Sequence, residues 1–190
     1  MGRKAIYTKT ELLDMTEMLM LQYGYEGFHM KLLSEHLSGA RSTIYQYYAN
    51  KEEVIAACLK RAMERILKRT EAIDETEPLE ALKFLLRAYI SEAKLHSLLV
   101  ETTKVKIAVS DMAKKDVDFV MAGHEELKIQ LSRITNAVQK KGYFRNDIPI
   151  PAIVSVFFSL IEAPNMMNLP SDDWADLLFK MWFEGACAER

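Results

Sequence analysis

Little in this chain favours any structural class other than a helical one. Its two cysteines, Cys58 and Cys187, are too few and too far apart in 190 residues for a disulfide framework or a zinc site, which suits a reduced cytoplasm. Seven glycines and five prolines supply few of the turns that an all-β fold needs. No apolar run reaches the roughly 18 to 20 residues of a membrane span, and residues 1–10 lack the apolar segment of a secretory signal. We therefore expect a cytoplasmic protein that does not insert into a membrane.

The net charge is small as well, at −2, which argues against a protein that coats nucleic acid indiscriminately. Its distribution is uneven, because residues 1–70 carry 11 Lys and Arg against 8 Asp and Glu, whereas residues 71–190 carry 14 against 19. The first part of the chain is thus mildly basic and the rest acidic. Hydrophobic residues make up 49% of the chain, which is enough for a core and excludes a disordered protein.

Apolar residues recur at helical spacing through almost the whole chain, so the sequence predicts an all-α fold. The first helix is expected to begin at Thr8, which forms a capping box with Glu11, and to end at Gly24, a glycine suited to a left-handed backbone. Asn50 is expected to cap the fourth helix. The helices after the first are predicted at residues 30–37, 41–48, 51–70, 78–97, 98–108, 117–141, 151–163 and 171–188.

The most informative stretch is residues 33–51, which reads as a short helix, a tight turn at residues 38–40 and a second short helix. A turn of that length can set the second helix at a steep angle to the first, which is how a helix is presented to the major groove of DNA. A rotation of about 100° per residue places Ile44 and Tyr48 on one side of the second helix. There they can pack into a small core with other apolar residues, namely Leu19, Leu33 and Leu37.

The opposite side of this helix carries side chains suited to DNA. Hydroxyl and amide groups exchange hydrogen bonds with base edges, and an arginine can make a paired contact with guanine. Tyrosine hydroxyls at intermediate positions suit phosphate oxygens, and a lysine at the N-terminus of the following helix stands where amides and charge favour a phosphate. Taken singly, such tyrosines are more often packing residues and such cations more often solvated, but the combination favours DNA contact. The candidate DNA-binding residues are Arg41, Ser42, Thr43, Tyr45, Gln46, Tyr47 and Lys51.

In this region the sequence resembles the TetR family of bacterial transcriptional regulators. The resemblance covers about residues 8–57 and rests on four motifs: Tyr23-Gly24-Tyr25-Glu26-Gly27, Met30-Lys31-Leu32-Leu33-Ser34-Glu35-His36-Leu37, Arg41-Ser42-Thr43-Ile44-Tyr45-Gln46-Tyr47-Tyr48 and Asn50-Lys51-Glu52-Glu53. It implies an all-helical homodimer, with an N-terminal three-helix helix-turn-helix DNA-binding domain (residues 1–50) followed by a helical ligand-binding and dimerisation domain (residues 51–190). It also implies that the start of the fourth helix joins the DNA-binding surface and that the seven candidate residues line the DNA.

Two segments depart from the family's pattern. Ser38-Gly39-Ala40 stands where Gly-Val-Ser usually joins the two helices, so Ala40 lacks the hydroxyl with which serine caps the third helix, at a cost of about 1 kcal/mol. Phe28-His29 stands where Thr-Ser normally opens the second helix. The altered turn is the one feature that supports an alternative, a helical dimeric interaction module whose helix-turn-helix has decayed.

The last two predicted helices carry more apolar residues than one face can hold. Residues 152–161 are apolar nearly all round, so a helix there must be covered on several sides. Two such helices from each of two subunits can form a four-helix interface about a two-fold axis, and a monomer core is the alternative. The apolar set of the final helix is Trp174, Leu177, Leu178, Phe179, Met181, Trp182 and Phe183.

The sequence does not identify the residues that bind an effector. Eleven methionines suggest an adaptable interior that accepts an apolar small molecule, although Met is also an ordinary gap-filler. Several side chains of the middle and later helices can line such a pocket or simply form the core: Tyr89, His96, Phe119, Met121, His124, Phe157 and Phe158. Cys58 reads either as a thiol switch or as a buried small hydrophobic residue. The spacing of the histidines fits no metal site, and no cofactor motif or catalytic constellation is recognisable, so the sequence predicts no metal, no cofactor and no enzyme.

The sequence therefore predicts a ligand-responsive transcriptional regulator, in the first place a repressor, that binds palindromic operator DNA as a homodimer. An effector bound among the C-terminal helices is expected to shift the fourth helix and to change the separation of the two DNA-reading helices, which would release the operator.

Overall fold

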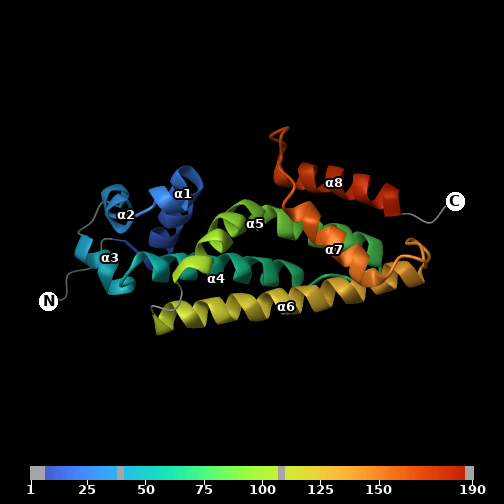
Figure 1. Ribbon diagram of the computed structural model, residues 1–190, viewed down its shortest axis with the longest axis horizontal. Coiled ribbons are helices and arrows are strands. Elements are labelled where there is room, and N and C mark those ends of the chain that lie inside the picture. The colour runs from blue at the N-terminus through green and yellow to red at the C-terminus, as the bar shows by residue number, and fades with distance from the viewer. Residues whose placement is uncertain (1–6, 38–40, 107–109, 187–190) are drawn as a thin grey trace. The chain divides into compact units, whose positions relative to one another are not determined.

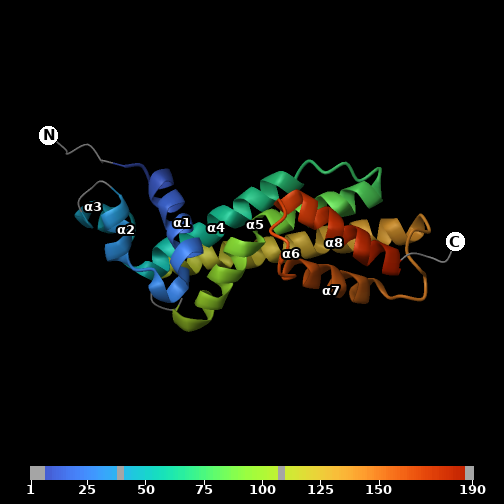
Figure 2. The same ribbon diagram turned by 90° about the horizontal axis from the view of Figure 1, so that it is seen from above.

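The structure is a computed structural model, and it describes residues 7–37, 41–106 and 110–186. For residues 41, 42, 94, 96–106 and 186 it describes the backbone alone. These ranges hold eight α-helices and no strand, which confirms the predicted all-α fold. The helices, drawn in Figures 1 and 2, are α1 (Lys9–Gly27), α2 (Met30–His36), α3 (Arg41–Tyr47), α4 (Lys51–Thr70), α5 (Pro78–Lys106), α6 (Asp111–Lys140), α7 (Ile150–Ile161) and α8 (Ser171–Ala186).

The chain divides into two compact units. The first comprises Met1–Glu64 and Lys94–Met121, and the second comprises Arg65–Ala93 and Ala122–Arg190. Helices α1 to α3 belong to the first unit and α7 and α8 to the second, whereas α4, α5 and α6 contribute residues to both. The predicted functional division at residue 50 stays a prediction. Within the described ranges, no helix is long and apolar enough to span a lipid bilayer.

Helix α1 begins as its sequence predicts. The Thr8 hydroxyl accepts a hydrogen bond from the Glu11 amide (3.2 Å), and the Glu11 carboxylate accepts one from the Thr8 amide (2.6 Å), which completes the predicted capping box. The end of the helix differs from the prediction. Gly24 has the expected positive φ of 66°, but its ψ of −177° is extended, so the residue kinks the helix instead of ending it. A short helical turn follows and ends at Gly27.

Helices α2 and α4 are both capped by side chains. His29 takes the place of the usual hydroxyl residue before α2, because its Nδ1 accepts a hydrogen bond from the Leu32 amide at 2.9 Å. Asn50 caps α4 as predicted, since its side-chain oxygen accepts a hydrogen bond from the Glu53 amide at 2.8 Å. The departure at residue 29 therefore leaves the start of α2 capped. The altered turn at residues 38–40 lies outside the described residues.

Apolar residues of α1, α2 and α3 meet in one small core, and these three helices lie beside the first turns of α4 (Figures 1 and 2). Leu19 comes from α1, Leu33 and Leu37 come from α2 and its end, and Ile44 and Tyr48 come from α3 and its end. All five are buried, as predicted. Since α3 is only seven residues long, it depends on this core for its position.

Two helix boundaries in the middle of the chain differ from the prediction. The structure has the single helix α5 up to Lys106 where two helices, 78–97 and 98–108, were predicted, because neither Pro nor Gly interrupts the chain between Pro78 and Lys106. Helix α6 begins at Asp111, earlier than the predicted residue 117. The hydroxyl of Ser110 accepts a hydrogen bond from the Ala113 amide at 3.5 Å, and Asp111 places an acidic group where the helix dipole favours it.

The second unit is packed around aromatic rings from α5, α7, α8 and the loop after α6. The Trp182 ring of α8 lies edge-on to Phe144 and Phe157, with ring centres 5.3 and 5.4 Å apart. Tyr89 of α5 packs against Phe157 of α7, and its hydroxyl donates a hydrogen bond to the Leu127 carbonyl of α6 at 3.3 Å. These contacts tie α5, α6, α7 and α8 to one cluster of rings.

Charged contacts fasten α8 to α5 at the edge of this cluster. The Nε of Arg87 donates a hydrogen bond to Asp176 at 2.6 Å, its Nη2 donates a second at 2.5 Å, and Lys83 lies 3.7 Å from the same carboxylate. The hydrogen bonds from Arg87 lower the pKa of Asp176, and burial opposes this shift. A bidentate pair of this kind sets the direction of α8 as well as its distance from α5.

Candidate DNA-binding site

Helix α3 is attached to the core by one side only. Ile44 and Tyr48 are 0% and 1% exposed, whereas Tyr45 is 41% exposed and Gln46 lies on the surface. The Tyr48 amide donates a hydrogen bond to the Ile44 carbonyl at 3.0 Å, so the helical turn continues to the buried tyrosine. The arrangement leaves Tyr45 and Gln46, two of the predicted DNA-binding residues, on a surface that a ligand outside the protein can reach.

Two other predicted residues of α3, Thr43 and Tyr47, have less open surroundings. Thr43 is half-buried. Tyr47 is also half-buried, and its hydroxyl donates a hydrogen bond to the Tyr7 carbonyl at 3.5 Å. Arg41 and Ser42 form the start of α3, and their side chains lie outside the described residues. Among the described side chains of the site, the exposed ones on α3 are therefore Tyr45 and Gln46.

Lys51, at the start of α4, is engaged within the protein. Its ammonium donates a hydrogen bond to the Tyr25 carbonyl at 2.5 Å and lies 3.6 Å from the centre of the Tyr25 ring, which is a cation–π arrangement. Burial lowers the pKa of Lys51, and the neighbouring Glu26 and Glu52 oppose this shift. The Lys51 ammonium thus contacts Tyr25 near the end of α1, so a DNA phosphate bound to Lys51 would share the ammonium with Tyr25.

Glu53 joins the end of α3 to the N-termini of α4 and α6, a role that its place in the sequence only partly reveals. One carboxylate oxygen accepts a hydrogen bond from the Ala49 amide at 2.6 Å, and the other accepts one from the Ser110 hydroxyl at 2.5 Å. The side chain is buried. The spacing of Asn50 and Glu53 is that of a capping box and is readable in the sequence. The contact with Ser110 depends on the fold.

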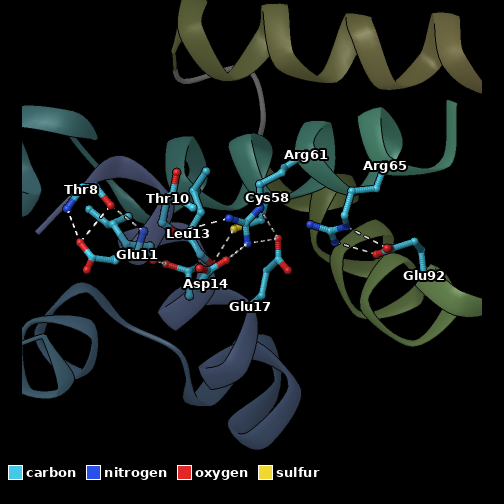
Figure 3. A network of polar contacts seen from close by, with 12 residues as sticks. Thr8, Thr10, Glu11, Leu13, Asp14, Glu17, Cys58, Arg61, Arg65 and Glu92 are labelled. Carbon is cyan, nitrogen blue, oxygen red and sulfur yellow. Dashed lines mark hydrogen bonds and ion pairs between the residues drawn. The ribbon is translucent and has the colours of Figure 1, made fainter. Parts of the chain in front are cut away.

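Arg61 of α4 binds α1 directly, as Figure 3 shows. Its Nε and Nη2 donate to the Glu17 carboxylate at 2.8 and 2.7 Å, and Nη2 also lies 2.8 Å from Asp14. A further bond from Nη1 reaches the Thr10 carbonyl at 3.4 Å. The guanidinium therefore holds two turns of α1 against α4, so that the helices that support α3 behave as one body. No local pattern in the sequence indicates this contact.

The candidate effector-lining residues differ in their burial. In the second unit, Tyr89 and Phe157 are buried, Phe158 stacks on Tyr89 with ring centres 6.4 Å apart, and burial lowers the pKa of His124. In the first unit, Phe119 and Met121 are 36% and 62% exposed. The His96 side chain lies outside the described residues. Among the described side chains of the set, Tyr89 and Phe157 are thus the most enclosed.

Cys58 lies in the interior of the first unit. None of its surface is exposed, and its Sγ is 3.9 Å from the Leu13 carbonyl. This confirms the interpretation as a buried small residue. Over residues 7–37, 41–106 and 110–186, no three His, Cys, Asp or Glu side chains are grouped as metal ligands.

A short amphipathic helix presented by a small three-helix core, followed by a larger helical part, defines a helix-turn-helix regulator. Residues 12–58 match the family model described as "Bacterial regulatory proteins, tetR family". The match and the curated relatives support a regulator similar to the TetR family of bacterial transcriptional regulators.

Two curated relatives illustrate the similarity. The chain is 28% identical over 113 residues to the HTH-type transcriptional repressor KstR of Rhodococcus jostii, covering 59% of this chain and 53% of that protein. It is 24% identical over 152 residues to the HTH-type transcriptional repressor AcnR of Corynebacterium efficiens, covering 80% and 77%. The chain thus spans about half the length of the first relative and about three quarters of the second.

Solved structures share the fold over nearly the whole chain. The ketosteroid transcriptional regulator KstR2 of Mycobacterium tuberculosis superposes with a TM-score of 0.76 at 15% identity, covering 98% of this chain and all of that one. AibR, solved with isovaleryl coenzyme A and operator DNA, superposes with a TM-score of 0.69 at 17% identity, covering 95% and 98%. At these identities the likeness concerns the fold alone.

Proposed function

We propose that this chain is a transcriptional repressor that binds a palindromic operator as a homodimer through α3 and releases it when a small-molecule effector binds the second unit. The observation that carries the proposal is the two-sided character of α3. Ile44 and Tyr48 fix the helix to the core, while Tyr45 and Gln46 remain exposed. A helix held in this way can enter the major groove without rearrangement of its support.

Exposed apolar residues on the last two helices support the dimer. Val156 of α7 is 49% exposed and Met181 of α8 is 65% exposed, although both helices also bury aromatic residues. A stable interface buries about 800 Å² on each partner, and apolar side chains on two adjacent helices suit that purpose. A two-fold axis through this surface would pair two α3 helices, as a palindromic operator requires.

The structural relatives suggest which effectors to test first. AibR has been solved with isovaleryl coenzyme A, and FadR of Bacillus subtilis with stearoyl-CoA. Both ligands join an apolar acyl chain to a polar carrier, and the second unit of this chain offers an aromatic interior around Tyr89 and Phe157. An effector that binds the DNA-incompetent form more tightly shifts the population towards that form, whatever the path of the change.

The DNA-binding part is tested by selecting fragments from the source genome with the purified chain and measuring their affinity by fluorescence anisotropy. Gln46→Ala removes an exposed amide of α3 and should weaken binding by about 5- to 150-fold. Gln22→Ala, the same change on the exposed surface of α1, is the matched control and should leave the affinity unchanged. Binding without sequence preference or salt dependence would favour the decayed interaction module instead.

The dimer and the effector need separate measurements. Met181→Lys should convert the dimer to a monomer in light scattering after gel filtration, while Met121→Lys, an equally exposed methionine of α6, should not. Isovaleryl-CoA and stearoyl-CoA are then titrated into the DNA complex, and release of the labelled fragment identifies an effector. A dimer that survives both Met181→Lys and Val156→Lys would place the interface elsewhere.

A further inference from the structure

A cleft in the first unit is lined by α1 and by the end of α2, and the proposed function assigns nothing to it. Its volume is about 440 Å³, which lies in the range of small-molecule sites. Residues three, four and seven positions apart share one face of a helix, so α1 presents one continuous wall of the cleft. The two walls are formed by Glu11, Asp14, Met15 and Met18 of α1 and by His36 and Leu37 at the end of α2.

Methionines supply most of the apolar lining. Met15 is half-buried and Met18 is 45% exposed, while Leu37 is buried. Unbranched thioether side chains adapt to the shape of a bound molecule. The α1 wall therefore offers apolar surface that a ligand can cover, and burial of that surface favours binding.

Carboxylates supply the polar part of the α1 wall, and Figure 3 shows both of them with their contacts. One Glu11 oxygen accepts hydrogen bonds from Thr8, and one Asp14 oxygen pairs with Arg61 at 2.8 Å. Among the described residues, the second oxygen of each carboxylate has no hydrogen-bond or ion-pair partner. Arg61 also binds Glu17, so its single positive charge does not neutralise all three carboxylates. The α1 wall thus keeps a negative charge and unused acceptors.

His36 adds an acceptor from the α2 wall. Its Nδ1 lies 3.0 Å from the Leu32 carbonyl oxygen, which can only accept, so Nδ1 carries the proton of the neutral ring and Nε2 is an acceptor. Over the described part of the chain, no three His, Cys, Asp or Glu side chains are grouped closely enough to hold a metal ion. Glu11, Asp14 and His36 therefore suit a larger cation that donates several hydrogen bonds.

Tyr7 also lines the cleft and connects it to α3. Its ring centre lies 6.5 Å from that of Tyr47, the last residue of α3. Tyr7 is 6% exposed, and its buried hydroxyl has no hydrogen-bond partner of normal geometry among the described residues. Burial raises the pKa of this hydroxyl, and the nearby Thr43 side chain opposes the shift. A buried hydroxyl without a partner destabilises a protein, so a ligand that supplies the missing hydrogen bond gains affinity from it.

We propose that this cleft binds an organic ammonium ion whose N–H groups donate to Glu11, Asp14 and His36 while its apolar body covers the two methionines. The inference goes beyond the proposed function, because it adds a small-molecule site in the first unit, and it does not rest on DNA binding. Charge complementarity decides the class of ligand, since the lining residues include two carboxylates and neither Lys nor Arg. A phosphate or another anion would be repelled there.

The probe is 4-phenylbutylamine, and 4-phenylbutanol is the matched neutral molecule. Each is titrated into the full chain without DNA, and nuclear magnetic resonance follows isotope-labelled methionine methyl groups. The signals of Met15 and Met18 are assigned with Met15→Leu and Met18→Leu. The amine should shift both signals saturably, and the alcohol should bind about 3- to 30-fold more weakly, because it lacks the charge that two carboxylates attract.

Neutralising the carboxylates tests the same assignment from the side of the protein. Glu11→Gln/Asp14→Asn removes both charges, and glutamine can keep the capping box of α1. This variant should bind the amine about 3- to 30-fold more weakly and the alcohol as before. Glu125→Gln/Glu126→Gln removes two exposed carboxylates of α6 in the second unit, and this matched control should leave both affinities unchanged.

A positive charge placed in the cleft should exclude the probe. Met18→Lys should abolish the binding of the amine, whereas Met121→Lys, which changes an exposed methionine of α6, should not. Circular dichroism should match the unaltered chain for both variants, because both side chains are exposed. A Met18→Lys chain that is folded and binds the amine as before overturns the proposal.

The remaining outcomes are equally decisive. No saturable shift of Met15 and Met18, or equal affinities for the amine and the alcohol, overturns the proposal. Signals of these methionines that change on dilution of the chain alone identify a second copy of the chain as the occupant and also overturn it. Because the titration contains no DNA, its failure leaves the proposed function standing, and a chain that selects no operator leaves the ammonium site standing.

Discussion

Replacing Arg61 by methionine should destabilise the first unit by about 2 kcal/mol, because it removes two charge-assisted hydrogen bonds to a carboxylate with little other solvation. The Arg61 and Glu17 side chains are only 19% and 15% exposed, whereas Asp14 is 64% exposed. The substitution takes this cation away from the half-buried Glu17 carboxylate, which adds to the cost. The contact with Asp14 is largely screened by solvent and should contribute less than about 1 kcal/mol.

The measurement is urea denaturation followed by far-ultraviolet circular dichroism, arranged as two double-mutant cycles. Arg61→Met combined with Glu17→Gln should show a coupling energy of about 1 to 2 kcal/mol, and Arg61→Met combined with Asp14→Asn a value below about 0.5 kcal/mol. These partners offer a comparison in which burial differs while the distances from Arg61 are nearly equal. Equal coupling in the two cycles, or an Arg61→Met chain as stable as the original, would refute the reasoning that burial decides the strength of this contact.

Three further predictions concern stability. Tyr48→Phe removes a buried hydroxyl that has no hydrogen-bond partner among the described residues, so it should leave the free energy of unfolding unchanged or raise it by up to about 1 kcal/mol; a clear loss in urea denaturation would show that the hydroxyl is bonded. Gly24→Ala should lower the free energy of unfolding by about 1 to 3 kcal/mol in the same assay, because the backbone at φ 66° strains an alanine even though its Cβ meets no atom within 4 Å. Gly185→Ala on α8, where a Cβ also meets no atom within 4 Å, is the control and should stabilise its helix. Asp176→Asn should destabilise the protein at neutral pH, and the difference from the original chain should vanish in acid. Because the pKa of Asp176 is lowered in the folded state, the ionised carboxylate stabilises the fold above about pH 4, and this stabilisation is lost as the pH falls through the folded-state pKa. Denaturation across a pH series measures the effect.

The contacts around α3 give the proposed mechanism a structural basis. Arg61 joins α1 to α4, and Glu53 joins the end of α3 to the start of α4 and to Ser110, the cap of α6. These links lie within the first unit, so its helices should move together when an effector changes the equilibrium. The seven predicted DNA-binding residues remain a prediction, and Tyr45 and Gln46 are the exposed ones among those whose side chains are described.

Local patterns were enough to predict several features of the site. The capping box of Thr8 and Glu11, the cap at Asn50, and the burial of Ile44 and Tyr48 with Gln46 outside all agree with the structure. Each depends on residues within one or two helical turns, where spacing alone decides which groups can meet. The positions of α7 and α8 were also close to their predicted bounds for the same reason.

Predictions failed where a local signal was weak or ambiguous. A kink and a helix end both favour a glycine with positive φ, so the sequence could not tell that α1 resumes after Gly24. The predicted boundary between residues 97 and 98 was wrong, because residues 98–106 contain no Pro or Gly and continue helix α5. The sequence showed His29 where the family usually has a hydroxyl residue, but not that its imidazole nitrogen accepts the capping hydrogen bond.

The amino-acid sequence by itself determined most of the helices, the caps at Thr8 and Asn50 and the two-sided nature of α3, because these follow from the period of the helix and from hydrogen bonds between near neighbours in the chain. Only the tertiary structure decided that Lys51 is drawn to Tyr25, that Arg61 binds Glu17 and that Tyr7 and Lys9 lie against the end of α3. These contacts join residues 26, 44 and about 40 positions apart. They arise because burying the common core brings separate helices together, and no local spacing encodes which charged or aromatic side chains then meet.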